Sequence, residues 1–104
     1  MKLLLDECVP RRLKNDLFEH ETLNQAGFTG LKNGKLIEAA GRGKFEVLIT
    51  VDKNIQHQQN KNTLPVAIVI LSAFSNRYES LSPLIPKTLR VLTKINIGEI
   101  VIIK

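Results

Sequence analysis

The chain has 104 residues, of which 43% are hydrophobic and 24% are charged. These ordinary values exclude a mainly disordered chain, and the length suits one small domain over residues 1–104. No apolar run approaches the roughly 20 residues of a membrane-spanning helix, so no membrane association is expected. The single cysteine excludes an internal disulfide and predicts a cytoplasmic protein.

The charge of the chain is unevenly distributed. Fifteen Lys and Arg oppose ten Asp and Glu, which gives a net charge of +5. Residues 1–55 hold nine basic and eight acidic side chains, whereas residues 56–104 hold six and two. A basic chain attracts phosphate polymers, so RNA is the expected partner class. The acids of the first half indicate either solvated helix faces or a metal site.

The first half of the chain predicts alternating strands and helices. Lys2–Leu5 is a short apolar run typical of a buried strand. Pro10 suits the first turn of a helix, where its missing N–H costs nothing, and leucines follow it at helical spacing. A second strand is expected over Glu21–Asn24. Asn33 is a suitable N-cap for a helix over Gly34–Ala40.

The second half continues this alternation. The middle helix is expected to stop at Gly41–Gly43. Phe45–Val51 and Pro65–Leu71 are β-branched and apolar, which predicts two central strands. A capping-box pattern of Asn and Glu favours a helix over residues 76–94, although two prolines lie in its early turns. Glu99–Ile103 is the last expected strand.

Helices between apolar strands predict parallel pairing through right-handed crossovers. The expected fold is α/β, a three-layer α/β/α sandwich around a central, mainly parallel sheet. Ligands of such sheets bind beyond the carboxyl ends of the strands. Asp6 and Glu7 follow the first strand, and Asp52 follows the Phe45–Val51 strand.

Carboxylates at two neighbouring strand ends indicate a metal site. Clustered carboxylates repel one another unless a cation holds them, and Mg²⁺ or Mn²⁺ prefers oxygen ligands. Such an ion could polarise a phosphodiester and activate water. For either aspartate alone, capping the next helix is the simpler interpretation.

Three segments carry a resemblance to a known family. They are Met1–Pro10 (MKLLLDECVP), Asn33–Ala40 (NGKLIEAA) and Val47–Asn54 (VLITVDKN). Together they resemble the small bacterial PIN-like domains, often labelled as a domain of unknown function and related to the PIN nucleases of toxin–antitoxin systems. The resemblance spans nearly the whole chain. It implies a Rossmann-like sandwich with an acidic cleft that binds Mg²⁺ or Mn²⁺, and ribonuclease activity.

The resemblance can be carried over residue by residue. Asp6 matches the first family aspartate, Asp52 the later one, and Glu7 the frequent second acid of the opening. Asn33 stands where the family often has Asp; its amide oxygen could ligate a metal but adds no charge. Glu38, one turn further on, could replace that acid or could be a solvated surface residue.

Several other residues have candidate roles. Lys53 and Asn54 directly follow Asp52 and are candidates for substrate contact. Arg11 and Arg12 could contact phosphate or form a solvated helix face. Cys8 is interpreted as a small apolar filler.

The leading hypothesis is a Mg²⁺- or Mn²⁺-dependent nuclease in which Asp6 and Asp52 hold the catalytic metal. It would act on RNA, as the toxin of a toxin–antitoxin pair with a cognate antitoxin protein as partner. One alternative is a non-catalytic PIN-like domain that binds RNA or a protein. Another is a receiver-like domain with Asp52 as phosphoacceptor, although no lysine stands in the loop that this class needs after the fifth strand. A homodimer is a separate expectation about partners, because a short basic domain with apolar strands often forms one.

Overall fold

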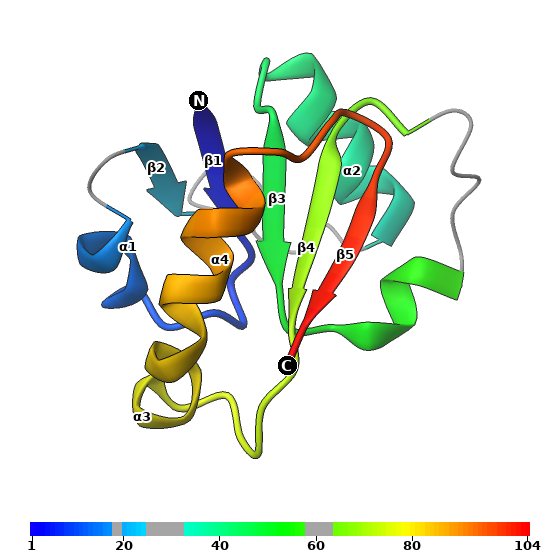
Figure 1. Ribbon diagram of the computed structural model, residues 1–104. Helices are drawn as coiled ribbons and strands as arrows, with labels where there is room; N and C mark the ends of the chain where they lie inside the picture. Colours follow the sequence, from blue (N-terminus) through cyan, green and yellow to red (C-terminus); the bar gives the residue numbers. More distant parts are fainter. Residues whose placement is uncertain (18–19, 25–32, 58–63) are drawn as a thin grey trace.

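A computed structural model describes residues 1–17, 20–24, 33–57 and 64–104. Five strands form one all-parallel sheet in the order β2-β1-β3-β4-β5. Their bounds are β1 Lys2–Leu5, β2 Glu21–Asn24, β3 Val47–Thr50, β4 Ala67–Leu71 and β5 Ile100–Ile103. The carboxyl ends of β3, β4 and β5 point the same way in Figure 1. All five strands were predicted from the sequence.

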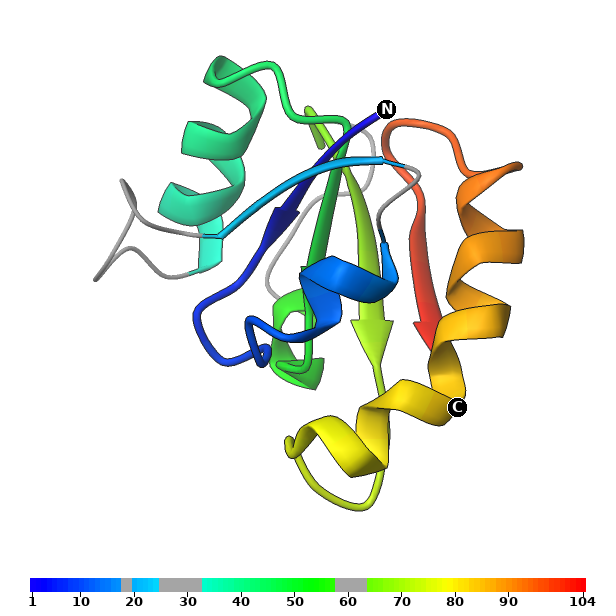
Figure 2. The same ribbon diagram turned by 90° about the vertical axis from the view of Figure 1, so that its left-hand side faces the viewer.

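Helices lie on both faces of this sheet. The helices are α1 Leu13–Asp16, α2 Asn33–Arg42, α3 Tyr78–Leu81 and α4 Ile85–Leu92, and the short 3₁₀ helices are η1 Lys53–His57 and η3 Ser82–Leu84. Figure 2 shows α2 on one side of the sheet and α4 on the other. No helix within the described ranges is long and apolar enough to cross a bilayer.

Strand residues alternate between two apolar clusters, one on each face. On the first face, Leu3, Leu5, Val47 and Ile49 pack with Leu13 of α1 and with leucines of α3 and α4. On the second face, Leu4, Leu48, Ile68 and Ile70 pack with α2 and with Ile55 of η1. The predicted three-layer α/β/α sandwich is therefore confirmed.

One crossover differs from the prediction that all are right-handed. The β1–α1–β2 connection steps toward one edge of the sheet, and β4–α4–β5 steps toward the other. Because α1 and α4 pack on the same face, the two connections have opposite hands. The arrangement in Figure 1 makes β4–α4–β5 the left-handed one, a hand found in only about 2% of such connections.

A contact with α1 accompanies this unusual path. The Tyr78 hydroxyl at the start of α3 donates a hydrogen bond to Asp16 Oδ2 at 2.6 Å, and the Arg12 guanidinium lies 4.2 Å from the Tyr78 ring centroid. Leu81, with no exposed surface, joins the same apolar cluster as Leu13. These contacts hold the segment after β4 on the α1 face of the sheet.

The end of α2 was predicted wrongly. The helix continues through Gly41 and ends in a Schellman motif, in which Phe45 N–H donates to Ala40 O and Lys44 N–H to Gly41 O, both at 3.1 Å. Lys44, with φ of 63°, takes the left-handed position that glycine usually fills. Gly41 serves close packing instead, since a Cβ there would lie 2.6 Å from the Cβ of Pro65.

The single helix expected over residues 76–94 is three short helices. Pro83 lies in η3 and Pro86 at the start of α4, and a proline has no N–H for a continuous helical ladder. The expected capping box is also absent from the described contacts: Arg77 is the N-cap of α3 and makes no side-chain cap. Ser75 Oγ instead accepts a hydrogen bond from Arg77 N–H at 3.2 Å.

Candidate functional site

The candidate site lies where the order of the strands reverses. The chain leaves β1 toward β2 on one side, whereas β3 leads to β4 on the other, so β1 and β3 flank the topological switch point. Ligands of doubly wound sheets bind outside the carboxyl ends of the strands at this point. Asp6 directly follows β1, and Asp52 lies two residues beyond β3. Asp6 N–H donates to Ile49 O at 2.9 Å, which holds the two strand ends together.

Thr50 joins the two aspartates. The Thr50 hydroxyl donates a hydrogen bond to Asp6 Oδ2 at 2.7 Å. The hydroxyl oxygen, Thr50 Oγ1, accepts a hydrogen bond from Asp52 N–H at 3.1 Å. Thr50 has no exposed surface, while both aspartates are partly exposed. The hydroxyl thus fixes one carboxylate oxygen of Asp6 from beneath and holds the Asp52 backbone beside it.

Asp52 also begins the following helical turn. Its Oδ1 accepts a hydrogen bond from Asn54 N–H at 3.0 Å, as a capping aspartate does. Ile55, one residue further, is 1% exposed and packs under α2, which anchors this turn to the sheet. The Oδ2 atom has no hydrogen-bond partner among the described residues. Capping therefore occupies one oxygen of Asp52 and leaves the other for a ligand.

Cys8 is not the apolar filler that the sequence indicated. The residue is exposed, and its Sγ lies 3.7 Å from Thr50 Oγ1. Because the Thr50 hydroxyl proton is directed at Asp6, the thiol is the donor in this contact. Partial desolvation of the sulfur raises the pKa of Cys8, and the Asp6 charge raises it further. Cys8 is therefore a protonated thiol at neutral pH, which disfavours a nucleophilic role.

The other predicted metal ligands do not complete a cluster in the described structure. Glu7 is exposed beside Asp6. Glu38 lies on the solvent side of α2 and pairs with Arg42, 3.1 Å from Oε1 to Nη2. The side chain of Asn33 lies outside the described residues. Within the described part of the chain, no three Asp, Glu, His or Cys side chains gather as a metal-binding group.

The predicted substrate contacts surround the same edge of the sheet. Lys53 and Asn54 are exposed at the start of η1, directly after Asp52. Arg11 is exposed in the turn that follows β1. Arg12 is exposed but stacks on Tyr78, so its guanidinium has a fixed position. All four side chains leave from the carboxyl ends of β1 and β3.

Thr50 is the site residue that the sequence reasoning missed. In the expected Phe45–Val51 strand it is one of several β-branched residues. Its signal is its position, because it is the polar member of the Val47–Thr50 strand and stands two residues before Asp52. In an extended segment, residues two apart share a face.

No family model matches the chain, and neither the curated proteins nor the solved structures contain a significant match. The geometry of the site is therefore the basis for its interpretation. It consists of an aspartate after each of two adjacent strands, a buried hydroxyl that bonds to the carboxylate of one and to the backbone N–H of the other, and exposed cations in the same loops. Such a set can hold a hard divalent cation through carboxylate oxygens and attract a phosphate group.

Proposed function

We propose that the protein is a Mg²⁺- or Mn²⁺-dependent nuclease of the PIN-like type that cleaves RNA. The observation that carries this proposal is the convergence of Asp6 and Asp52, 46 residues apart in the chain, on the Thr50 hydroxyl at the switch point. A bound cation would polarise the phosphodiester and lower the pKa of the attacking water. Asp6 and Asp52 would be the protein ligands of this cation.

The neighbouring residues would position the substrate. Lys53 and Arg11 are exposed cations at the same strand ends and would contact phosphate. Glu7 is close enough in sequence to assist the cation. Glu38 would have to leave Arg42 to do so, and Asn33 could add only a neutral oxygen.

The test is cleavage of single-stranded RNA by the purified protein with Mn²⁺ or Mg²⁺. Asp6→Asn and Asp52→Asn should each lower the rate at least about a hundredfold, because each removes a charged ligand that stabilises the transition state. Glu46→Gln is the matched control. Glu46 directly precedes β3, at the amino ends of the strands and so opposite to the candidate site, and it accepts a hydrogen bond from Lys2 N–H. Cleavage that survives both aspartate substitutions would refute the assignment.

A second candidate is a non-catalytic domain that binds RNA or a protein. It is favoured by the number of acids, because the described residues bring only Asp6 and Asp52 together. The two candidates differ in metal binding. Titration calorimetry with Mn²⁺ should detect a site that Asp6→Asn removes if the protein is the enzyme, and no site if it is only a binding domain.

The cellular role is proposed by analogy with PIN nucleases. A cytoplasmic toxin neutralised by a cognate antitoxin would arrest growth when expressed alone. Asp6→Ala should abolish this arrest. Arrest by the variant would indicate a role that does not require the site.

A further inference from the structure

The outer edge of β5 presents unpaired main-chain groups. Ile68 N–H donates to Glu99 O and Ser72 N–H donates to Ile103 O, each at 2.8 Å. In a parallel ladder the main-chain groups of every second residue face the neighbouring strand, so Val101 and Ile103 direct their N–H and C=O groups toward β4. The N–H and C=O groups of Ile100 and Ile102 therefore point away from the sheet. No described residue forms a hydrogen bond with them.

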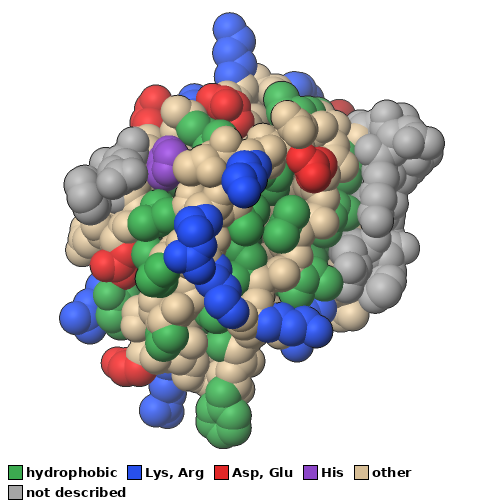
Figure 3. Space-filling view, in the orientation of Figure 1, with side chains coloured by type: hydrophobic (Ala, Val, Ile, Leu, Met, Phe, Trp, Pro, Cys, Tyr) green, Lys and Arg blue, Asp and Glu red, His purple; other side chains and the backbone are tan. Residues whose placement is uncertain are grey.

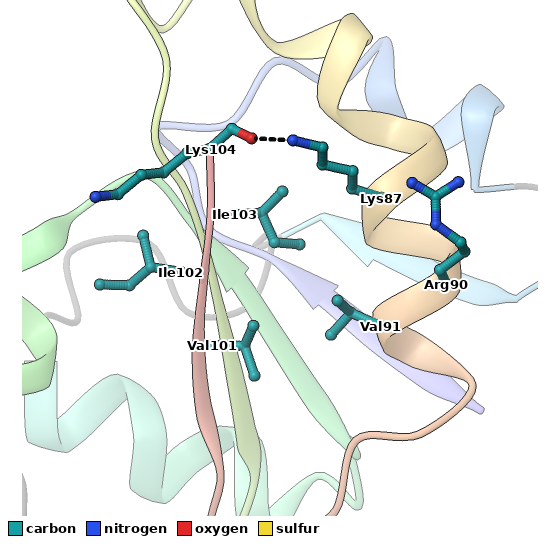
Figure 4. Close-up of a pocket in the computed structure, with 7 residues that line it drawn as sticks. All are labelled: Lys87, Arg90, Val91, Val101, Ile102, Ile103 and Lys104. Carbon is teal, nitrogen blue, oxygen red and sulfur yellow. Dashed lines mark hydrogen bonds between the residues drawn. The ribbon is translucent and has the colours of Figure 1, made fainter.

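Apolar surface lies on both sides of this edge. Ile102 is 37% exposed. On the α4 side, a groove of about 370 Å³ runs between α4 and β5. Figure 4 shows Val101 and Ile103 directed from the strand toward α4, where Val91 faces them. Figure 1 shows α4 in front of the centre of the sheet rather than in front of β5, and the groove lies between the two elements.

The rim of the groove is basic. Lys87 and Arg90 of α4 line it, as does Lys104 at the end of β5, whose side chain is directed away from α4 in Figure 4, and no acidic residue lines it. All three side chains are exposed, and none takes part in an ion pair within the described part of the chain. Lys87 Nζ donates to the main-chain oxygen of Lys104 at 2.7 Å, which fixes this cation at the end of β5. Figure 3 shows Lys and Arg side chains across the middle of the face that is in view, with apolar side chains beside them.

We propose that the β5 edge binds an extended, acidic segment of a partner protein, which joins the sheet as a sixth strand. Main-chain hydrogen bonds to Ile100 and Ile102 would supply the pairing. Alternate apolar side chains would cover Ile102 on one face of the sheet, and the acidic side chains between them would cross the groove on the α4 face. Carboxylates of the segment would lie near Lys87 and Arg90 of α4, so the charges are complementary.

Charge selects this occupant over two others. A second copy of the chain would bring the same three cations to the groove and carries a net charge of +5. RNA would meet no aromatic side chain there, since the lining residues include none. An acidic strand satisfies the unpaired main chain, the apolar groove and the cations together. β5 lies two strands away from β3, the nearer strand of the proposed nuclease site, so this binding is independent of that site.

The probe is a short capped peptide in which valine and glutamate alternate, added to the isotope-labelled protein. We expect the amide signals of Ile100 and Ile102 to exchange rapidly with solvent in the free protein and slowly with the peptide bound. Val101 and Ile103 should exchange slowly in both states, because they pair with β4.

Arg90→Glu should weaken binding about fivefold at low salt, as the loss of an exposed charge contact does. Lys35→Glu on α2 makes the same change in net charge and should leave the affinity unchanged.

Two N-methylated peptides test the strand geometry. One carries the methyl group at every valine and the other at every glutamate, so each blocks one edge of the added strand. Only one of the two should lose binding. Ile102→Pro should abolish binding and leave the fold intact by circular dichroism, because this N–H is not part of the β4 ladder.

Four results would each overturn the proposal. They are no binding of the acidic peptide, equal binding of both methylated peptides, equal binding of a peptide with lysine in place of glutamate, and slow exchange of Ile100 and Ile102 in the free protein. A dimer that buries Ile102, detected by light scattering, would identify a second copy as the occupant instead.

Discussion

At the scale of single residues, the Thr50 hydroxyl is the contact that organises the candidate site. Thr50→Val keeps the shape of the side chain but removes the hydroxyl that donates to Asp6 and that accepts from Asp52 N–H. We expect a loss of about 1–2 kcal/mol in the free energy of unfolding, measured by urea denaturation, because a hydrogen bond to a charged group is lost. Metal affinity should fall as well, since Asp6 loses its fixed orientation.

Thr88→Val is the matched control for this substitution. Thr88 is as fully buried as Thr50, but within the described ranges its hydroxyl bonds only to the helix carbonyl of Leu84, at 2.8 Å. Its loss should cost about 0.5 kcal/mol or less, because such helix back-bonding contributes little. If Thr50→Val were no more destabilising than Thr88→Val, the Asp6–Thr50–Asp52 contacts would contribute nothing to stability.

Tyr78 is a second residue with a measurable signature, because it is the single tyrosine and the chain has no tryptophan. Its hydrogen bond to Asp16 raises the pKa of the phenol, and the nearby Arg12 charge partly opposes this. The ultraviolet absorbance of tyrosinate should therefore titrate above the ordinary value of about 10. Asp16→Ala should lower this pKa, and Arg12→Gln should raise it further.

The sign of the linked stability follows from this raised pKa. The contact stabilises the fold fully below the unfolded-state value, and this stabilisation is lost as the pH rises through the higher folded-state pKa. In Asp16→Ala, the stability should decline less across the same alkaline range. A wild-type titration at the ordinary pKa would mean that the Tyr78–Asp16 contact does not form in solution.

At the scale of elements, strands were predictable and helix ends were not. The apolar runs identify β1, β3 and β4 because buried parallel strands need only continuous burial. The ends of α2 and α4 depend on contacts with distant residues. Gly41 looks like a helix stop in the sequence, yet it accommodates Pro65, 24 residues away. The path of the left-handed crossover likewise involves distant residues, because Leu81 packs in the same cluster as Leu13 and Tyr78 bonds to Asp16, 62 residues away in the chain.

Gly41→Ala tests this interpretation of the α2 glycine. Alanine would improve helix propensity by about 1 kcal/mol, but its Cβ would overlap Pro65 at a cost of about 1–3 kcal/mol. We expect a net loss of stability in urea denaturation. Lys44→Gly is the control of opposite sign, and should stabilise by about 1 kcal/mol because it relieves the left-handed backbone. A stabilised Gly41→Ala variant would show that Pro65 does not press on the helix.

At the scale of the whole molecule, the sequence predicts that the candidate site lies at the carboxyl ends of the strands, but it does not determine which acidic side chains gather there. Parallel topology alone brings Asp6 and Asp52 to adjacent strand ends. It does not determine which side of α2 carries Glu38, because that depends on how the helix rotates to bury Leu36 and Ile37. Glu38 consequently faces solvent and Arg42 rather than a cation. The net charge of +5 gives no information about this detail, but it does bear on how RNA would bind.

The positions of the cations make RNA binding measurable apart from cleavage. The Asp6→Asn protein should bind single-stranded RNA with an affinity that falls as the salt concentration rises. In a plot of the logarithm of the binding constant against the logarithm of the salt concentration, each neutralised phosphate contributes about 0.7 to the negative slope. Lys53→Gln and Arg11→Gln should each reduce the slope by about this amount, because both side chains lie at the carboxyl ends of the strands. Arg42→Gln should not, since Arg42 lies at the far end of α2 and pairs with Glu38. Equal effects of all three substitutions would indicate diffuse attraction by net charge, and the phosphate backbone would then have no defined path past Asp6 and Asp52.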